Sequence, residues 1–149
     1  FPCFFKIGVK NNINFKKYDL FYLPETAEEI ELSEYDFIVD AIDNVTAKLE
    51  LIERANKLNI PVISSMGTGN KLHPEMFEIA DINKTSVCPL ARVMRRELKN
   101  RGVKKLTVVY SKEEPQNIDG ARTPASSTFV PISAGILIAS KVVQDILSL

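Results

Sequence analysis

The sequence predicts an α/β fold, a Rossmann-like and mostly parallel sheet with flanking helices, on the strength of three observations. Short β-branched and aromatic runs of strand length alternate with segments of helical periodicity. A strand–helix–strand series from Phe37 to Ser65 fits a βαβ unit, whose strands run parallel. The 149 residues, 45% hydrophobic and 26% charged, have the size and composition of a single domain.

The first part of the chain is expected to contain short elements. Residues 1–18 turn from apolar to basic and asparagine-rich without strong periodicity. Asp19–Leu23 has the composition of a short strand. Thr26 and Glu29 have capping-box spacing, which predicts a helix to about Leu32.

The central elements follow from periodicity and capping. Phe37–Val39 has the length of a buried strand, and Asn44 is the expected N-cap of a helix that ends near Leu58. The later patterns predict a strand at Val62–Ser65, a strand at Phe77–Ile82, a helix from Pro89 to about Arg101 with Cys88 at its N-cap, a strand at Leu106–Tyr110, and a helix from Pro131 to Leu149.

The C-terminal region combines a loop with an apolar helix. Residues 111–128 are rich in Pro, Gly, Ser, Thr and charge, which predicts a mobile crossover loop. The last helix has a wide apolar face, so we expect it to pack on the sheet and on a second subunit. The residues expected to be buried there are Ile132, Gly135, Ile136, Ala139, Val142, Val143, Ile146 and Leu147.

Composition narrows the class of protein. Lys+Arg and Asp+Glu balance at 19 each, so no global field favours nucleic acid or a membrane, although a local patch could. No apolar run reaches the roughly 20 residues of a membrane span. Two cysteines and one histidine form neither a disulfide framework nor a closed zinc site, which is typical of a cytoplasmic protein.

The best site candidate is the polar turn that contains Asp40, Asp43 and Asn44. It follows a strand at its carboxyl end, where open parallel sheets bind ligands, and carboxylates there can hold a metal–nucleotide. Aspartate is equally common in plain turns, so the spacing alone does not decide between the two interpretations.

Two further features carry weaker signals. Gly67-Thr68-Gly69 follows a strand but lacks the rest of a dinucleotide fingerprint, so a plain loop is the better interpretation. Cys88 precedes Pro89 at a helix N-terminus, where the partial positive charge favours a reactive thiolate. Most cysteines are nevertheless small buried hydrophobes.

A basic run spans the helix near residue 92 and the segment after it. A solvated helix face is the usual explanation of such a run, but contact with a phosphate backbone such as RNA is the alternative hypothesis. Within fourteen residues, Glu97 is the single acid against seven cations, namely Arg92, Arg95, Arg96, Lys99, Arg101, Lys104 and Lys105.

At Ile38–Asn44 the sequence resembles the ThiF/MoeB/HesA family of ubiquitin-activating-like adenylating enzymes, in which a hydrophobic strand ends in a D-x-x-D-N motif. The resemblance runs from about Phe21 to the C-terminus. Four further segments are similar to the tRNA threonylcarbamoyladenosine dehydratase branch, namely Ile63–Leu72, Ala80–Thr85, Cys88–Arg92 and Tyr110–Pro115.

The resemblance implies an activity. Such enzymes use ATP and Mg²⁺ to activate the carboxyl of N6-threonylcarbamoyladenosine at tRNA position 37, and the carbamoyl nitrogen then closes the ring. Asp43 would be the catalytic acid at the ATP–Mg²⁺ site, supported by Asp40 and Asn44. The basic helix would hold the tRNA backbone through Arg92, Arg95, Arg96 and Lys99, and a homodimer is expected.

Two departures from the family pattern shape the alternatives. The chain has no C-x-x-C pairs, which points away from the sulfur-carrier branches. The family's glycine-rich nucleotide loop is also absent, so we expect the C-terminal part of a longer enzyme, inactive alone, or a degenerate relative. Adenylation of a ubiquitin-like sulfur carrier, with a sulfur-transfer or sulfur-acceptor protein as partner, stays an alternative. So does a non-catalytic RNA-binding or dimerisation module.

Overall fold

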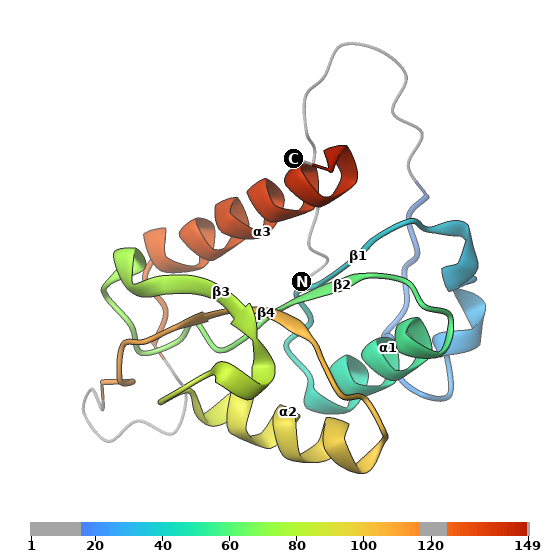
Figure 1. The fold of residues 1–149 in the computed structure, drawn as a ribbon, viewed down its shortest axis with the longest axis horizontal. Coiled ribbons are helices and arrows are strands. Elements are labelled where there is room, and N and C mark those ends of the chain that lie inside the picture. The colour runs from blue at the N-terminus through green and yellow to red at the C-terminus, as the bar shows by residue number, and fades with distance from the viewer. Residues whose placement is uncertain (1–15, 117–124, 149) are drawn as a thin grey trace.

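The computed structural model describes residues 16–116 and 125–148, in which four strands form one sheet of order β1-β2-β4-β3. Strands β1, β2 and β4 are parallel, and β3 pairs with β4 in the antiparallel direction at the edge (Figure 1). Their bounds are β1 Ile38–Asp40, β2 Val62–Ser65, β3 Phe77–Asp81 and β4 Thr107–Ser111. The predicted mostly parallel α/β fold is therefore confirmed.

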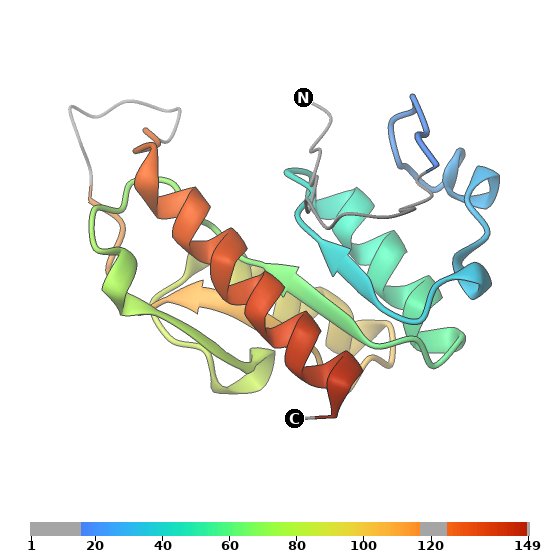
Figure 2. The ribbon, with the colours of Figure 1, turned by 90° about the horizontal axis from the view of Figure 1, so that it is seen from above.

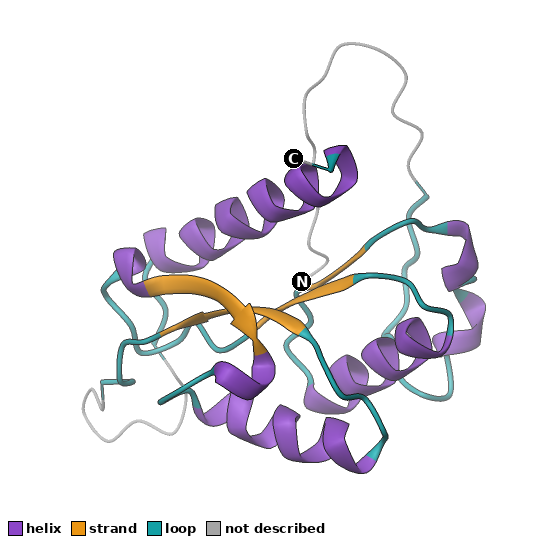
Figure 3. Cartoon of the chain, viewed as in Figure 1, coloured by secondary structure: helices purple, strands orange, loops and turns teal. Residues whose placement is uncertain are grey.

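Helices cover both faces of the sheet (Figure 3). Helices α1 (Val45–Lys57) and α2 (Pro89–Asn100) lie side by side on one face. Helix α3 (Phe129–Leu147) crosses the other face diagonally, over β2, β3 and β4 (Figure 2). Short 3-10 turns connect these elements at Ala27–Glu29, Leu32–Glu34, Pro74–Met76 and Ile82–Lys84.

Apolar side chains from both layers meet the sheet and form its core. Under α1 and α2, side chains such as Ile52, Met94 and Val108 are fully buried. Beneath α3, Ile63 and Val109 pack against Val130, Ala134 and Ile138. Each buried large apolar side chain stabilises the folded protein by about 1.5–3 kcal/mol. Packing of the helices on both faces therefore holds the strand ends in place.

The predicted βαβ unit and its caps are present. The Asn44 side chain accepts a hydrogen bond from Ala47 N at 3.0 Å, as an N-cap should. Helix α2 begins at Pro89 after Cys88, as predicted, and ends before Gly102, whose φ of 77° suits glycine.

The N-terminal predictions are wrong in detail. Asp19–Leu23 forms no strand, and the helix expected from Thr26 is replaced by the two 3-10 turns near it. The Thr26 hydroxyl accepts from Leu23 N at 3.0 Å instead of capping the following turn. Residues 1–15 lie outside the described part of the chain.

Strand β1 is more exposed than predicted. Val39 is 47% exposed, although the run Phe37–Val39 has the composition of a buried strand. β1 lies at the edge of the described sheet, and α3 lies over β2, β3 and β4 rather than over β1. Only the residues facing α1, Ile38 and Asp40, are buried.

The sheet covers only part of the apolar face predicted for α3, and the predicted packing on a second subunit stays a prediction. The residues buried on the sheet are Val130, Ala134 and Ile138, whereas Gly135, Ala139 and Val142 are half-buried. Five residues expected to be buried are exposed by 49–63%, namely Ile132, Ile136, Val143, Ile146 and Leu147. A single sheet face covers only one stripe of a helix, so the wide apolar face extends beyond that contact.

By length and composition alone, α3 could cross a membrane, although no span was expected from the sequence. Its inner stripe packs on the sheet, as in a helix that covers a core. The predicted crossover loop over 111–128 is described only at its two ends, because residues 117–124 lie outside the described part.

Candidate functional site

A cavity of about 640 Å³ opens at the carboxyl ends of the parallel strands. Its walls come from the segments after β1, β2 and β4 and from the start of α2. This is where an open parallel sheet binds ligands, and the volume lies within the usual range of small-molecule sites. The lining residues are Ala41–Asp43, Lys48, Ser65–Lys71, Cys88–Leu90, Pro115 and Ser126.

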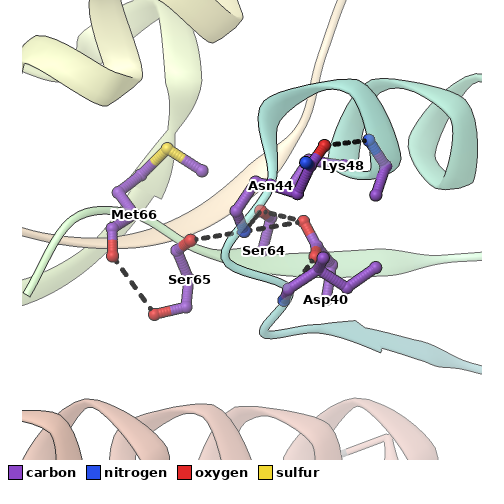
Figure 4. Close-up of polar contacts among 8 residues, drawn as sticks. Asp40, Asn44, Lys48, Ser64, Ser65 and Met66 are labelled. Atoms are coloured by element: carbon purple, nitrogen blue, oxygen red, sulfur yellow. Dashed lines mark hydrogen bonds and ion pairs between the residues drawn. The ribbon is translucent and has the colours of Figure 1, made fainter. Parts of the chain in front are cut away.

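Asp40 lies beneath this cavity in a closed polar network (Figure 4). Its Oδ2 atom accepts from Lys48 Nζ at 3.0 Å and from Ser64 Oγ at 2.5 Å. Its Oδ1 atom accepts from Ile42 N at 3.1 Å, which forms a local turn after the strand. Asp40 is fully buried and both of its oxygens have partners, so it shapes the site rather than facing a ligand directly.

Lys48 connects the strand ends under the cavity. Besides its ion pair with Asp40, its Nζ atom donates to Ser65 O at 2.8 Å and lies 3.4 Å from Ser64 Oγ. The lysine comes from α1, the aspartate from β1 and the serines from β2 (Figure 4). One buried cation therefore holds three elements in register.

Asp43 and Asn44, the other members of the predicted site, have different settings. Asp43 is exposed and lines the cavity, and its carboxylate has no hydrogen bond or ion pair within the described residues. The Asn44 amide oxygen instead accepts from Ala47 N at the start of α1. Asp43 alone of the three predicted residues presents an unpaired oxygen donor to the cavity.

A second buried lysine, Lys71, lies farther along the cavity wall. Its Nζ atom donates to the backbone carbonyl of Glu113, just after β4. Burial lowers the pKa of Lys71, and the neighbouring Cys88 and Glu113 offset this only in part.

Glu113 holds the Lys71 segment in place. Its carboxylate accepts from Leu72 N at 2.9 Å and from His73 N at 2.9 Å. Burial raises the pKa of this carboxyl, but the hydrogen bonds from His73 and Leu72 lower it, and the net shift is downward.

Asn70 ties both ends of the crossover loop to the cavity rim. Its backbone carbonyl accepts from Gln116 N at 2.8 Å, and its backbone N–H donates to Ala125 O at 2.7 Å. Its side-chain oxygen accepts from Ala125 N at 2.6 Å. Gly67-Thr68-Gly69, for which a plain loop was the better interpretation, therefore lines the cavity together with Asn70, which also anchors a distant segment.

The start of α2 closes one end of the cavity. Cys88 is buried at 4% exposure and lines the wall, with no side-chain capping bond at the helix start. Val87 before it has φ of 45°, a strained conformation for a β-branched residue. The structure places Cys88 in the site but leaves its reactivity a prediction.

The basic residues of α2 separate into two groups. Arg92, Arg96 and Lys99 are exposed, although Arg96 pairs with Glu97 at 2.9 Å. Arg95 is half-buried, and its guanidinium donates to Ile82 O at 3.0 Å and to Thr85 O at 2.9 Å. Arg95 thus supports the loop after β3, in contrast to the exposed role predicted for it.

Sequence reasoning missed Lys48, Lys71 and Glu113. Lys48 shares the inward face of α1 with Ile52 and Ala55, so a cation at a core position was the available signal. Lys71 and Glu113 lie in irregular segments about 40 residues apart, and periodicity gives no information on their contact. In the described part of the chain, no group of three or more His, Cys, Asp or Glu side chains could hold a metal alone.

The sequence of this chain is similar to those of known proteins. The tRNA threonylcarbamoyladenosine dehydratase of Bacillus subtilis (strain 168) is 38% identical over 145 residues, which cover 86% of this chain and 57% of that protein. The tRNA threonylcarbamoyladenosine dehydratase 2 of Saccharomyces cerevisiae is 48% identical over 81 residues, 54% of this chain and 18% of that protein. The chain spans little more than half the length of the bacterial relative.

A solved structure has the same fold. The crystal structure of the E. coli tRNA N6-threonylcarbamoyladenosine dehydratase, TcdA, in complex with AMP superimposes with a TM-score of 0.79 at 25% identity. The match covers 88% of this chain and 56% of the E. coli chain. The family model described as ThiF family matches residues 8–147, which confirms the resemblance, and the chain belongs to the ThiF family.

Proposed function

We propose that this chain provides the C-terminal part of an ATP-dependent enzyme that dehydrates N6-threonylcarbamoyladenosine in tRNA to its cyclic form. The observation that carries the proposal is the unpaired Asp43 carboxylate at a cavity over the ends of three parallel strands. Similarity to the B. subtilis dehydratase over 86% of this chain supports the substrate class. The AMP held by TcdA supports the nucleotide.

The donor set of the cavity fits a magnesium ion that arrives with the nucleotide. Mg²⁺ commonly uses one or two carboxylates plus substrate phosphates. Asp43 is the one carboxylate among the described lining residues, so it would share the ion with the triphosphate. Bound there, the ion would offset charge on the phosphates as pyrophosphate leaves.

Asp40, Lys48 and Asn44 have a positioning role in this proposal. The Asp40–Ile42 hydrogen bond and the Asn44 cap fix the turn on both sides of Asp43. Lys48 fixes the end of β2 through Ser65 O. Preorganisation of this kind matters because a misplaced reacting group can lower the rate by about a hundredfold.

The reaction balances as two substitutions. A carboxylate oxygen of the threonylcarbamoyl group attacks the α-phosphorus of ATP, and pyrophosphate leaves. The carbamoyl nitrogen then attacks the activated carboxyl carbon and loses its proton, while AMP leaves with the original carboxylate oxygen. The cavity walls would hold the two anionic reactants together and limit competing hydrolysis.

The exposed cations of α2 support a tRNA contact surface beside the cavity. Arg92, Arg96 and Lys99 would bind backbone phosphates, which gives affinity without sequence selection. Helix α2 begins at the cavity wall, so tRNA on this surface would have its modified base close to the site.

A homodimer in the cytoplasm completes the proposal. The exposed apolar side chains of α3, including Ile132, Ile136 and Ile146, would pack against a second subunit. Sedimentation of the protein at micromolar concentration should give the mass of a dimer.

The test uses the whole protein that contains this chain, supplied with ATP, Mg²⁺ and threonylcarbamoyl-modified tRNA. We expect one AMP for each adenosine cyclised, measured by chromatography of nucleotides and digested tRNA. An uncyclised base with no AMP would overturn the proposal. AMP formed only with a ubiquitin-like sulfur carrier would favour the alternative substrate, and tRNA binding without any ATP effect would favour the non-catalytic module.

A further inference from the structure

The ammonium of Lys71 lines the cavity and keeps hydrogen-bond donors that a ligand could use. Lys71 is only 3% exposed and lines the cavity, yet it forms no ion pair within residues 16–116 and 125–148. The bond from its Nζ atom to the Glu113 carbonyl occupies one of three donors. The Glu113 carboxylate attracts this ammonium without forming an ion pair, because it accepts from Leu72 N and His73 N. Burial still lowers the pKa of Lys71, so an anion in direct contact would stabilise its charged form.

Lys48, the other lysine of the cavity, has no donor left for a ligand. Its Nζ atom is 3.0 Å from Asp40 Oδ2 and donates to two further oxygens. Of the two lysines, Lys71 therefore keeps donors that a bound anion could use.

The sheet topology separates Lys71 from Asp43. Asp43 follows β1, whereas Lys71 contacts Glu113 beyond the end of β4, and β2 lies between these strands. Adjacent strands are about 4.8 Å apart, so the two groups lie over strand ends roughly 10 Å apart. One cavity thus offers an oxygen donor for a metal–triphosphate and, at a distance, a cation for a different anion.

We propose that Lys71 binds the carboxylate of the threonylcarbamoyl group and so selects the modified base. This inference rests on the function proposed above and adds the residue that recognises the substrate. The backbone phosphates of a bound tRNA stay at the surface of the protein, whereas a small carboxylate on a base can enter the cavity and reach a buried ammonium. The Mg²⁺-bound triphosphate is assigned to the Asp43 end.

The ionisation of Lys71 is consistent with this role. Burial lowers its pKa in the free protein, and an arriving carboxylate would raise it again by Coulombic attraction. The charged form would then be most stable when the substrate is bound.

The test compares binding of two tRNAs by the whole protein. One carries threonylcarbamoyladenosine, and the other has unmodified adenosine at the same position. With wild type, the modified tRNA should bind more tightly. Lys71→Met should weaken that binding about ten- to hundredfold, the effect of one charged hydrogen bond, and leave the unmodified tRNA and the KM for ATP unchanged.

Two variants provide matched controls. Lys71→Arg keeps the charge and should retain part of the preference for the modified tRNA. Lys57→Met removes an exposed lysine of α1 far from the cavity lining and should bind both tRNAs as wild type does. Thermal melting checks that each variant is folded.

A tRNA whose threonylcarbamoyl carboxylate is blocked as the carboxamide tests wild type without any substitution. Its affinity should fall by a similar factor. The inference would be overturned if wild type bound the carboxamide tRNA as tightly as the modified tRNA. It would also be overturned if Lys71→Met lost affinity equally for both tRNAs, or if it raised the KM for ATP instead. Absence of turnover by wild type would mark failure of the proposed function, whereas normal turnover by Lys71→Met would mark failure of this inference alone.

Discussion

Lys48 and Lys71 line the same cavity and are equally buried at 3% exposure, yet among the described residues only Lys48 of the two forms an ion pair. The ammonium of Lys48 has Asp40 and two further oxygens around it, whereas that of Lys71 has a single backbone carbonyl. The first arrangement is complete without a ligand. The second keeps donors that a ligand can use, so two lysines of equal burial have different roles, one structural and the other in recognition.

The two aspartates of the motif differ in the same way. Asp40 is fully buried with both oxygens hydrogen-bonded, and Asp43 is exposed without a partner among the described residues. Residues whose polar groups are hydrogen-bonded within the protein thus support Asp43 at one end of the cavity and Lys71 at the other. Substitutions should separate the two roles. Changes at Asp40 or Lys48 should lower the stability of the protein, whereas changes at Asp43 or Lys71 should lower its activity or its affinity for the substrate.

The largest effect is expected from Lys48→Met. It leaves the Asp40 carboxylate buried without its cation, which should lower the free energy of unfolding by about 3–5 kcal/mol in urea titrations. The double variant Asp40→Leu/Lys48→Met removes both charges and should recover most of that loss. A loss below about 1 kcal/mol for the single variant would show that the pair is not essential to the fold.

Asp43→Asn should have nearly as large an effect, but on activity. Loss of one preorganised charge at the reacting phosphates typically lowers kcat by about 10²–10³-fold. Thermal stability should stay at the wild-type value, because the described residues make no contact with this carboxylate that would be lost. Asp36→Asn, at another exposed aspartate, is the control; equal activity of both variants would remove Asp43 from the site.

Arg95→Ala and Arg96→Ala should separate the two kinds of cation on α2. Arg95→Ala removes the bonds to Ile82 and Thr85 and should destabilise the protein by about 1.5–3 kcal/mol. Arg96→Ala should leave stability nearly unchanged and reduce the slope of log affinity for tRNA against log salt by about 1. The reverse assignment of these two effects would contradict the orientations described.

Asn44→Ala should have a smaller effect on stability. Loss of the cap to Ala47 N should lower the free energy of unfolding by about 1 kcal/mol, and Asn44→Asp should retain most of it. Chemical denaturation measures both variants. A large rise in the KM for ATP with unchanged stability would instead make Asn44 a direct nucleotide ligand.

The smallest effect concerns pH. Burial lowers the pKa of Lys71 in the folded protein, so between that value and the unfolded pKa of about 10.4 the unfolded chain binds more protons. The stability of wild type relative to Lys71→Met should therefore rise with pH across this interval and fall as pH drops through the folded pKa. If the difference in stability between wild type and Lys71→Met does not change with pH, the pKa of Lys71 is the same in the folded and the unfolded chain.

Much of the fold was predictable because it depends on local patterns. The β1–α1–β2 unit follows from apolar runs and the Asn44 cap, and the start of α2 follows from Pro89 after Cys88. Exposure of Val39 and of the outer face of α3 depends instead on which strands that helix covers. That arrangement is tertiary and leaves no mark on periodicity.

The candidate site was predictable only in part. The motif located Asp43, but it did not separate it from Asp40, because burial depends on Lys48 and Ser64 from other elements. Arg95 lies next to Met94 on the inward face of α2, so its helical position offered a signal that charge counting missed. The contact between Lys71 and Glu113 joins two loops and has no local signature.

The most direct test of the account follows one oxygen atom. The whole protein is supplied with ATP, Mg²⁺ and tRNA whose threonylcarbamoyl carboxylate is labelled with oxygen-18, and the products are analysed by mass spectrometry. Adenylation in the Asp43–Lys71 cavity predicts that each cyclised base transfers one labelled oxygen to AMP. Label in inorganic phosphate together with ADP, or cyclisation with unlabelled AMP, would contradict it.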